Sequence, residues 1–505
     1  MASPAPGAAA ADLPPVTRLL VLAVAAIGFL FDTYELLMFP VIGSQALAQL
    51  LDAPPTSDVV RLWSGRMLWI AALSGGIFGL LGGVLIDRLG RKTVMIGSIL
   101  VYSLSPLAAA YSNELWQLVL FRCTTFIGVC VELVAAVTWL AELFTDKKQR
   151  ELAIGWTLAC ASLGGILVTE VFTEIVGFMR EHPEGVSWLP VPPAAWRYTL
   201  LTGLIPGALI LFLMPFVPES RVWKEKKLAG TLQRPRFGEL FSPELRKTTI
   251  VTTLLSACGY AAAFGALQLT PLQMAPGLPR EDIAEKRKEV APAVKAASAK
   301  LKAAEDEDAK KVARRELAKA SAPFDKAVEP VRGNIQRWQE LGGLTGRILF
   351  AILLVYVASR VLIRIFLLPG VVLFPIAYLV LYQGDYGIFA TAIFCCGLVT
   401  VAQFSYVSEY LPKVFPVHLR GTGSAFATNV GGRMLGTMAA TLNTEFLSTL
   451  FLPGEGPEKN PQRVAMAAAV IGATVYVVAL VLSFMLPTPK EEAPAVPPAP
   501  EVPQG

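Results

Sequence analysis

The sequence predicts an all-α integral membrane protein with twelve transmembrane helices, on the basis of its low charge and its long apolar runs. Of 505 residues, 54% are hydrophobic and only 16% are charged, whereas soluble proteins carry about 25% charged residues. Residues 280–340 hold 27 of the 83 charged residues, so the rest of the chain is poorer still. Such a chain cannot cover a surface that faces water. This excludes a soluble enzyme, a secreted disulfide scaffold and a disordered regulator.

Twelve apolar runs are long enough to span a bilayer, which takes about 20 residues of helix. They are 18–43, 62–86, 91–111, 115–143, 152–178, 197–217, 247–274, 343–359, 365–382, 386–410, 422–449 and 463–486. Lysine and arginine gather in the connections after the second, fourth, sixth and eighth runs. Because cytoplasmic loops carry the excess of basic residues, we expect both termini in the cytoplasm and a multi-pass protein of the inner or plasma membrane.

The remaining segments divide the chain. We expect a disordered N-terminal tail (1–17), a first bundle (18–217), a cytoplasmic linker (218–246), a second bundle (247–486) and a Pro-rich disordered tail (487–505). Residues 275–340 are rich in Ala, Lys and Glu, which favour helix, and we expect one or two solvated helices on the outer side. This insertion is either decorative or a docking site for a protein partner.

Other partners and cofactors find little support in the sequence. The six cysteines lie within apolar runs, and there is no C-x-x-C pair, H-E-x-x-H motif or Gly-rich phosphate loop. We therefore predict no metal and no cofactor. No basic face for nucleic acid is visible, and no set of nucleophile, base and orienting residue indicates an enzyme.

A charged turn follows the second run, with the sequence Gly83-Val84-Leu85-Ile86-Asp87-Arg88-Leu89-Gly90-Arg91-Lys92. It resembles the G-x-L-a-D-r-x-G-R-K signature of the major facilitator superfamily. The resemblance implies two six-helix halves with a substrate site between them near the midplane. Asp87 can cap a helix and pair with an arginine, which makes the turn a candidate conformational latch. The alternative is simple anchoring of the loop by Arg88 and Arg91.

Three further matches extend this latch. Glu142 and Arg150 look like the family's Glu…Arg pair after the fourth span. Pro218-Glu219-Ser220-Arg221 is similar to the P-E-S-P-R ending of sugar-porter and organic-ion members. Glu409 and Arg420 look like the repeated element in the second half, whereas Ser359-Arg360 stands where the repeat would place its charged turn.

Carboxylates within the first and fourth runs are costly in lipid and therefore indicate function. Asp32-Thr33-Tyr34-Glu35-Leu36 resembles the D-G-Y-D-L motif of proton-coupled aromatic-acid and metabolite symporters. A spacing of three places Asp32 and Glu35 on one helix face. Two neighbouring carboxylates in a low dielectric cannot both ionise readily, so one can hold a proton. Together with Glu132 they are the candidate proton-coupling residues; the alternative is a helix–helix hydrogen bond.

Arginines within the fourth and eleventh runs are candidates for binding an anion. Arg122 and Arg433 both fall near the level of Asp32 when depth is counted along the helices. The planar guanidinium suits a carboxylate, although Arg433 could instead pair with an acid for structure alone. Polar residues that could add hydrogen bonds to a substrate are Tyr260, Gln268, Gln403, Tyr406 and Asn429.

These features predict a secondary active transporter that moves a small organic anion by alternating access, in symport with protons. Its expected partners are a small-molecule substrate, protons and the lipid bilayer. Two alternatives stay open: a sugar or polyol carrier, which would favour Gln, Asn and Trp in the site, and a transporter-derived sensor that binds ligand without moving it.

Overall fold

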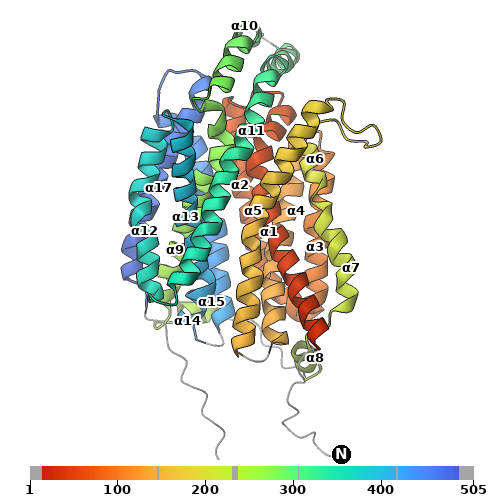
Figure 1. The fold of residues 1–505 in the computed structure, drawn as a ribbon, viewed down its shortest axis with the longest axis vertical. Helices are drawn as coiled ribbons and strands as arrows, with labels where there is room; N and C mark the ends of the chain where they lie inside the picture. Colours follow the sequence, from red (N-terminus) through yellow and green to blue (C-terminus); the bar gives the residue numbers. More distant parts are fainter. Residues whose placement is uncertain (1–13, 145–146, 230–236, 305, 417–418, 488–505) are drawn as a thin grey trace, which may run out of the picture.

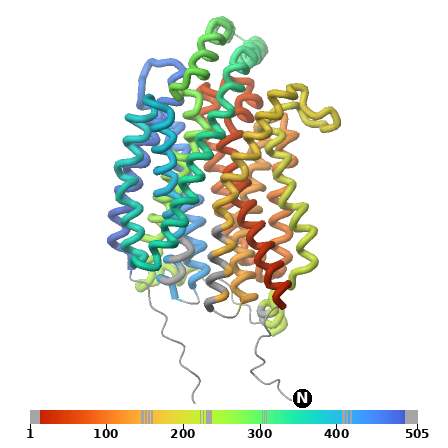
Figure 2. The backbone as a smooth tube through the Cα atoms, viewed as in Figure 1, coloured from red at the N-terminus to blue at the C-terminus, as the bar shows by residue number. Residues whose placement is uncertain are grey.

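The computed structural model describes residues 14–144, 147–229, 237–304, 306–416 and 419–487. Within them the chain forms an elongated bundle of helices that run along its long axis (Figures 1 and 2). The first part of the chain contributes α1 (Pro15–Leu50), α2 (Asp58–Leu89), α3 (Arg91–Ala110), α4 (Leu115–Leu143), α5 (Lys147–Glu181), α6 (Ala195–Leu201), α7 (Leu204–Leu213) and the short α8 (Arg221–Leu228). We call this part the N-half.

The second part, the C-half, is less regular. It contains α9 (Arg246–Ala262) with π-helical continuations η3 (Ala263–Leu267) and η4 (Thr270–Met274), α10 (Glu281–Ala303), α11 (Glu307–Leu353), α12 (Ser359–Pro375) with η6 (Ile376–Leu381), α13 (Tyr386–Glu409), α14 (Leu411–Val414), α15 (Arg420–Phe426), η8 (Ala427–Gly436), α16 (Met438–Thr441), η9 (Leu442–Phe446) and α17 (Asn460–Phe484). Short 3-10 turns at 214–216, 237–241, 275–277, 447–450 and 457–459 complete the helical segments.

The two ends of the bundle differ in the elements that lie there. Helix α10 and the start of α11 project from one end, which we call the hairpin side, and α1 begins and α17 ends at the other, the terminal side (Figure 1). Of the described residues, ten helices are long and apolar enough to cross a membrane. The predicted spans 343–359 and 422–449 are not among these ten. The first is part of the long, charged α11, and the second is a chain of short α- and π-helical pieces.

Small residues set how closely these helices pack, because a glycine lets a neighbouring backbone approach. A Cβ on Gly75 of α2 would lie 2.9 Å from the carbonyl oxygen of Phe126 on α4, and one on Gly128 of α4 would lie 2.7 Å from that of Ser98 on α3. At the turn between α2 and α3, Gly90 has φ of 102°, which favours glycine. The signature turn and the helices on both sides of it are thus held in one compact unit.

The charged insertion departs from the expectation that it would stand free to residue 340. α11 continues without a break from Glu307 to Leu353, for about 70 Å. Phe324, Val328, Val331 and Ile335 are buried, and their spacing of three and four places them on one helix face. Only the hairpin formed by α10 and the start of α11 projects, while the stretch from Phe324 onward packs into the bundle.

Candidate functional site

Two buried carboxylates face each other between α1 and α4. The carboxyl groups of Asp32 and Glu132 interact with each other electrostatically, and both side chains are buried. Glu132 occupies the space left by Gly28, one helical turn before Asp32, where an added Cβ would lie 2.5 Å from its Oε1. The predicted proton-coupling residues Asp32 and Glu132 are therefore brought together by the packing of α1 on α4.

Glu35 does not join this pair, contrary to the expectation from its spacing. Its Oε1 would lie 2.5 Å from a Cβ on Gly203, where α6 ends and α7 is about to begin. The side chain thus points into the N-half. Tyr102 of α3, which the sequence did not single out, lies within electrostatic reach of Asp32, Glu35 and Glu132. Tyr102 is buried as well, so this side chain belongs to the surroundings of both acidic positions.

Arg122 also lies inside the N-half. Its Nη1 and Nη2 donate to the carbonyl oxygens of Glu35 and Leu36 at 2.8 and 2.9 Å, and its guanidinium stacks over the rings of Phe39 and Phe126. These bonds use two of the guanidinium's five N–H donors, and binding of a substrate carboxylate by Arg122 stays a prediction. Through these two hydrogen bonds Arg122 ties α4 to α1.

Arg433 reaches the acidic pair from the C-half. It lies on the π-helical η8, donates from Nη1 to Oδ1 of Asn429 at 2.6 Å, and interacts electrostatically with Asp32. Asn429 in turn packs against Gly79 of α2. π-Helical turns are common at functional sites because they re-aim side chains. The predicted residues Arg433 and Asn429 are brought together at the interface between the halves.

An aromatic group lies beside Arg433. The ring of Tyr260 packs on Gly432, stacks parallel to Phe264 with centroids 5.9 Å apart, and meets Phe404 edge-on at 5.0 Å. The amide of Gln403 lies near Gly259, one residue before Tyr260, and Gln268 is buried two turns further along the same segment. The side chain of Tyr406 is not among those that the structure describes.

Sequence reasoning missed Glu340 and Arg347 on α11. The carboxyl group of Glu340 is 7% exposed and interacts electrostatically with Arg347, which in turn interacts with Tyr260. A predicted span beginning at residue 343 left Glu340 outside it. The signal in the sequence was the spacing of seven residues between Glu340 and Arg347, which places both charges on one helix face.

Hydrogen bonds between the halves gather on the hairpin side in the part of the chain described. Arg332 of α11 donates to Ser44 at 2.9 Å, Gln273 donates to Ser64 at 2.9 Å, and Arg61 donates to Ser448 at 2.7 Å. Further pairs are Arg337 with Glu170, Arg66 with Glu445, Gln45 with Glu329 and Asn460 with Asp58. We call these contacts the gate. They hold the hairpin side closed.

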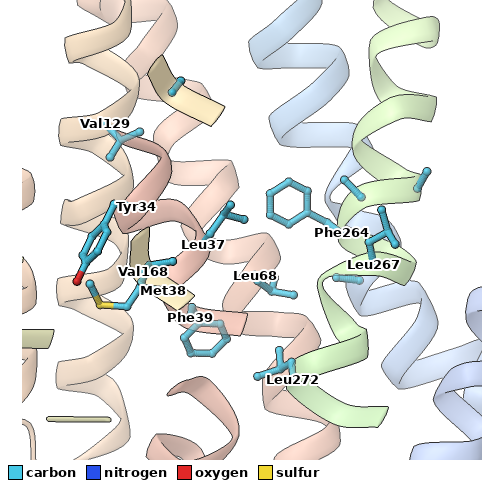
Figure 3. Close-up of a cluster of buried hydrophobic side chains, with 14 of the residues drawn as sticks. Tyr34, Leu37, Met38, Phe39, Leu68, Val129, Val168, Phe264, Leu267 and Leu272 are labelled. Carbon is cyan, nitrogen blue, oxygen red and sulfur yellow. The ribbon is translucent and has the colours of Figure 1, made fainter. Parts of the chain in front are cut away.

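An apolar layer accompanies the gate. Figure 3 shows Leu37 of α1 and Phe264 of the C-half pointing toward each other, with Leu68, Leu267 and Leu272 beside them. All of these side chains are buried. Because α1 rises from the terminal side, Leu37 lies nearer the hairpin side than Asp32. The charged site is thus separated from the hairpin side by packed hydrocarbon.

Several residues of the predicted latch bond to one another within the N-half. Arg91 bonds to Asp87 at 3.1 Å and to Glu142 at 2.9 Å. The backbone N–H of Lys92, in the first turn of α3, donates to both carboxylate oxygens of Glu219 at 3.1 Å. Glu219 is therefore a carboxylate that satisfies this helix N-terminus, where the positive end of the dipole favours an anion. The sequence had assigned such a capping role to Asp87.

The structure describes the side chains of only some of the other predicted latch residues. Arg88 is exposed, Arg221 is the first residue of α8, and Arg420 begins α15, while Gly83 is half-buried in α2. The side chains of Arg150 and Glu409 lie outside the described residues. Trp223, which the sequence did not indicate, donates from Nε1 to the carbonyl of Asp87 at 2.8 Å and ties α8 to the signature turn.

Similarity to curated proteins covers part of the chain. It is 34% identical over 165 residues to the 4-hydroxybenzoate transporter PcaK of Pseudomonas putida, which covers 32% of this chain and 33% of that protein. It is 24% identical over 253 residues to the sialic acid transporter NanX of Escherichia coli (strain K12), which covers 49% and 55%. The chain thus spans between a third and somewhat over half the length of these relatives.

Similarity of fold covers nearly the whole chain. A crystal structure of a D-xylose-proton symporter superposes with a TM-score of 0.63 at 17% identity, covering 93% of this chain and 98% of that one. At this identity the match shows the fold alone. A family model described as Major Facilitator Superfamily matches residues 19–296, more than half of the chain. The protein therefore belongs to the Major Facilitator Superfamily, whose members are transporters and not enzymes.

Proposed function

We propose that the protein is a secondary active transporter that moves a small organic anion, with a carboxylate group, by alternating access in symport with protons. The observation that carries the proposal is that Asp32, buried in the N-half, interacts electrostatically with both Glu132 of the N-half and Arg433 of the C-half. An ionisable group at such depth is functional by default. The acids supply a proton site, and the arginine supplies a site for an anion.

Alternating access fits the position of this site between the halves. When the hairpin side is closed by the gate and the apolar layer, a substrate at Arg433 reaches only the terminal side. Rocking of the halves would break the gate and expose the same residues to the hairpin side. In this proposal the terminal side is cytoplasmic, both termini lie there, all twelve predicted spans cross the cell membrane, and the hairpin projects outward.

An aromatic carboxylate is the substrate class we favour. The guanidinium of Arg433 can bind a carboxylate through two parallel hydrogen bonds, and Tyr260, Phe264 and Phe404 offer rings on which an aromatic substrate can stack. Arg347 lies within electrostatic reach of Tyr260 and adds a second positive charge. The names of two relatives support this substrate class, since these proteins are transporters of 4-hydroxybenzoate and of 3-(3-hydroxy-phenyl)propionate.

A sugar carrier is the second candidate. The buried amides Gln268 and Gln403 suit hydroxyl groups, and an arabinose-proton symporter of Bacillus subtilis (strain 168) is 23% identical over 222 residues. A sugar, however, would leave the positive charge of Arg433 without an anionic ligand. That difference separates the two candidates in a binding assay.

Uptake into proteoliposomes tests the proposal. With an inside-alkaline pH gradient, labelled 4-hydroxybenzoate should accumulate above its outside concentration, and a proton ionophore should abolish the accumulation. Unlabelled benzoate should compete, whereas arabinose and xylose should not. Accumulation of the sugars alone would favour the second candidate, and saturable binding without uptake would indicate a sensor.

A further inference from the structure

Glu340 of α11 is a buried carboxylate to which the proposed transport cycle has so far given no role. Its Oε2 lies directly against Gly165 of α5, in space that any side chain at that position would occupy. The adjacent Gly164 packs on the backbone of α1, where a Cβ would lie 2.8 Å from the N of Tyr34. Glu340 therefore bridges from the C-half to the N-half, close to the first helix.

Two amides hold this carboxyl group. Nε2 of Gln336 and Nε2 of Gln339 donate to Oε1 at 2.8 and 3.1 Å. The other oxygen faces the glycine surface. Neutral amide donors orient a carboxyl group without fixing its charge, so the group can be held in either protonation state.

The charged groups around Glu340 are few in the described part of the chain. On its own helix, Arg347 lies seven residues on, about 10 Å away along the helix axis, and interacts with it electrostatically. On α5, the carboxylate of Glu170 is already paired with Arg337 at 2.6 Å. On α1, Leu37 is the side chain that meets Gly165, and Glu35 points instead toward Gly203. The packed helix α13 meets this stretch at Gly397, where a Cβ would meet the carbonyl oxygen of Gln339.

Closing the hairpin side changes the solvation of Glu340. The gate pair Arg337–Glu170 joins α11 to α5 within one turn of Glu340, so separation of these helices exposes the carboxyl group to water. In the present arrangement the carboxyl group lies against Gly165 and is buried. Burying an ionised carboxylate without a direct counter-ion is costly, whereas burying the protonated form is much less so.

We propose that Glu340 is a proton-binding residue of the gate: it takes up a proton from the hairpin side when that side is open, and closure requires the proton to be bound. This inference rests on the alternating access of the proposed function. Binding of the proton and closure are linked, so a lower pH favours the closed state. A single linked proton changes the ratio of open to closed molecules by at most about tenfold per pH unit.

Reactivity of a buried gate cysteine tests the linkage. Ser44→Cys places a thiol at a fully buried gate position that reacts with a thiol reagent only when the hairpin side opens. In proteoliposomes without substrate, its reaction rate, normalised to that of an exposed Val312→Cys reference, should fall as the pH is lowered from 8 to 5.5. Adding Glu340→Gln, which mimics the protonated form, should give slow labelling that no longer follows pH.

A matched control removes a different carboxylate from the same interface. Glu170→Gln breaks a half-exposed ion pair and should raise labelling at every pH while keeping the wild-type pH dependence. A second variant, Gly165→Ala, places a methyl group where the Glu340 carboxylate sits and should keep the hairpin side open at every pH. The proposal is wrong if Glu340→Gln retains the wild-type pH dependence, or if Gly165→Ala labels no faster than wild type.

The labelling assay needs neither substrate nor transport, so it separates this inference from the proposed function. If Glu340→Gln loses the pH dependence of labelling while wild type accumulates no carboxylate, Glu340 binds the proton linked to closure but the protein is not a carboxylate–proton symporter. Normal accumulation by wild type with an unchanged gate response in Glu340→Gln would reject the gate proton alone.

Discussion

Glu132 on α4 occupies the space that Gly28 leaves on α1, with its Oε1 2.5 Å from where a Cβ of residue 28 would be. This contact places Glu132 beside Asp32, one turn further along α1, and Asp32 interacts electrostatically with Arg433 of the other half. A glycine thus makes room for the acidic pair on which the proposed proton coupling depends.

Gly28→Ala should displace Glu132 from Asp32. We expect substrate exchange to persist while pH-driven accumulation falls several-fold, because the methyl group disturbs the acidic pair and leaves Arg433 in place. Gly97→Ala on α3 is the control, since no atom lies within 4 Å of the added carbon. Accumulation by Gly28→Ala equal to that of the control would show that the pair does not need this packing.

Arg433→Lys keeps the charge but loses the planar pair of donors. Loss of a charged hydrogen bond costs about 1.5–3 kcal/mol, so the dissociation constant for an aromatic carboxylate should rise roughly 10- to 150-fold. Isothermal titration of purified protein measures it. Arg364→Lys, which alters an arginine that donates to the carbonyl of Ser483, should leave binding unchanged. An unchanged dissociation constant in Arg433→Lys would make Arg433 structural.

Gly65 lets α2 approach the C-half on the hairpin side. A Cβ at this position would meet the hydroxyl of Thr444 and lie 2.6 Å from the carbonyl oxygen of Ala440. Gly65→Ala should therefore prevent full closure, raise the reactivity of Ser44→Cys and slow transport. Gly177→Ala on α5, where nothing lies within 4 Å, is the control. Wild-type labelling and uptake in Gly65→Ala would argue against the gate as described.

The latch offers a test of conformational control. Asp87→Asn weakens the bond to Arg91. A loss of ~1 kcal/mol of interaction free energy in one conformational state of the transporter should slow turnover about fivefold, with little change in substrate affinity. Uptake at saturating substrate measures it. Arg88→Gln, at the exposed neighbouring position, should be close to wild type. Equal turnover in both variants would remove the latch role from Asp87.

Much of this arrangement was predictable from sequence. The all-helical membrane fold follows from apolar run length, and Asp32, Glu132 and Arg433 stand out because charge in lipid is costly. Depth counted along the helices then placed Asp32 and Arg433 at one level. The signature turn predicted that Asp87 pairs with an arginine, which the structure shows to be Arg91.

Side-chain direction was less predictable. Spacing suggested that Asp32 and Glu35 work together, but which neighbour each carboxyl group meets depends on glycines in other helices, Gly28 in one case and Gly203 in the other. Arg122 was visible as a buried charge, yet its donors are used by carbonyls of α1. Glu340 was hidden because α11 passes from the charged hairpin into the bundle without a break.

Symport as proposed here requires that Asp32 carries the coupled proton. Asp32→Asn fixes a neutral side chain at this position, so the most direct measurement is uptake of labelled 4-hydroxybenzoate by proteoliposomes under a pH gradient, beside exchange of labelled for unlabelled substrate without a gradient. We expect gradient-driven accumulation to vanish while exchange persists, since exchange needs no release of the proton. Accumulation of substrate against its gradient by Asp32→Asn would contradict it.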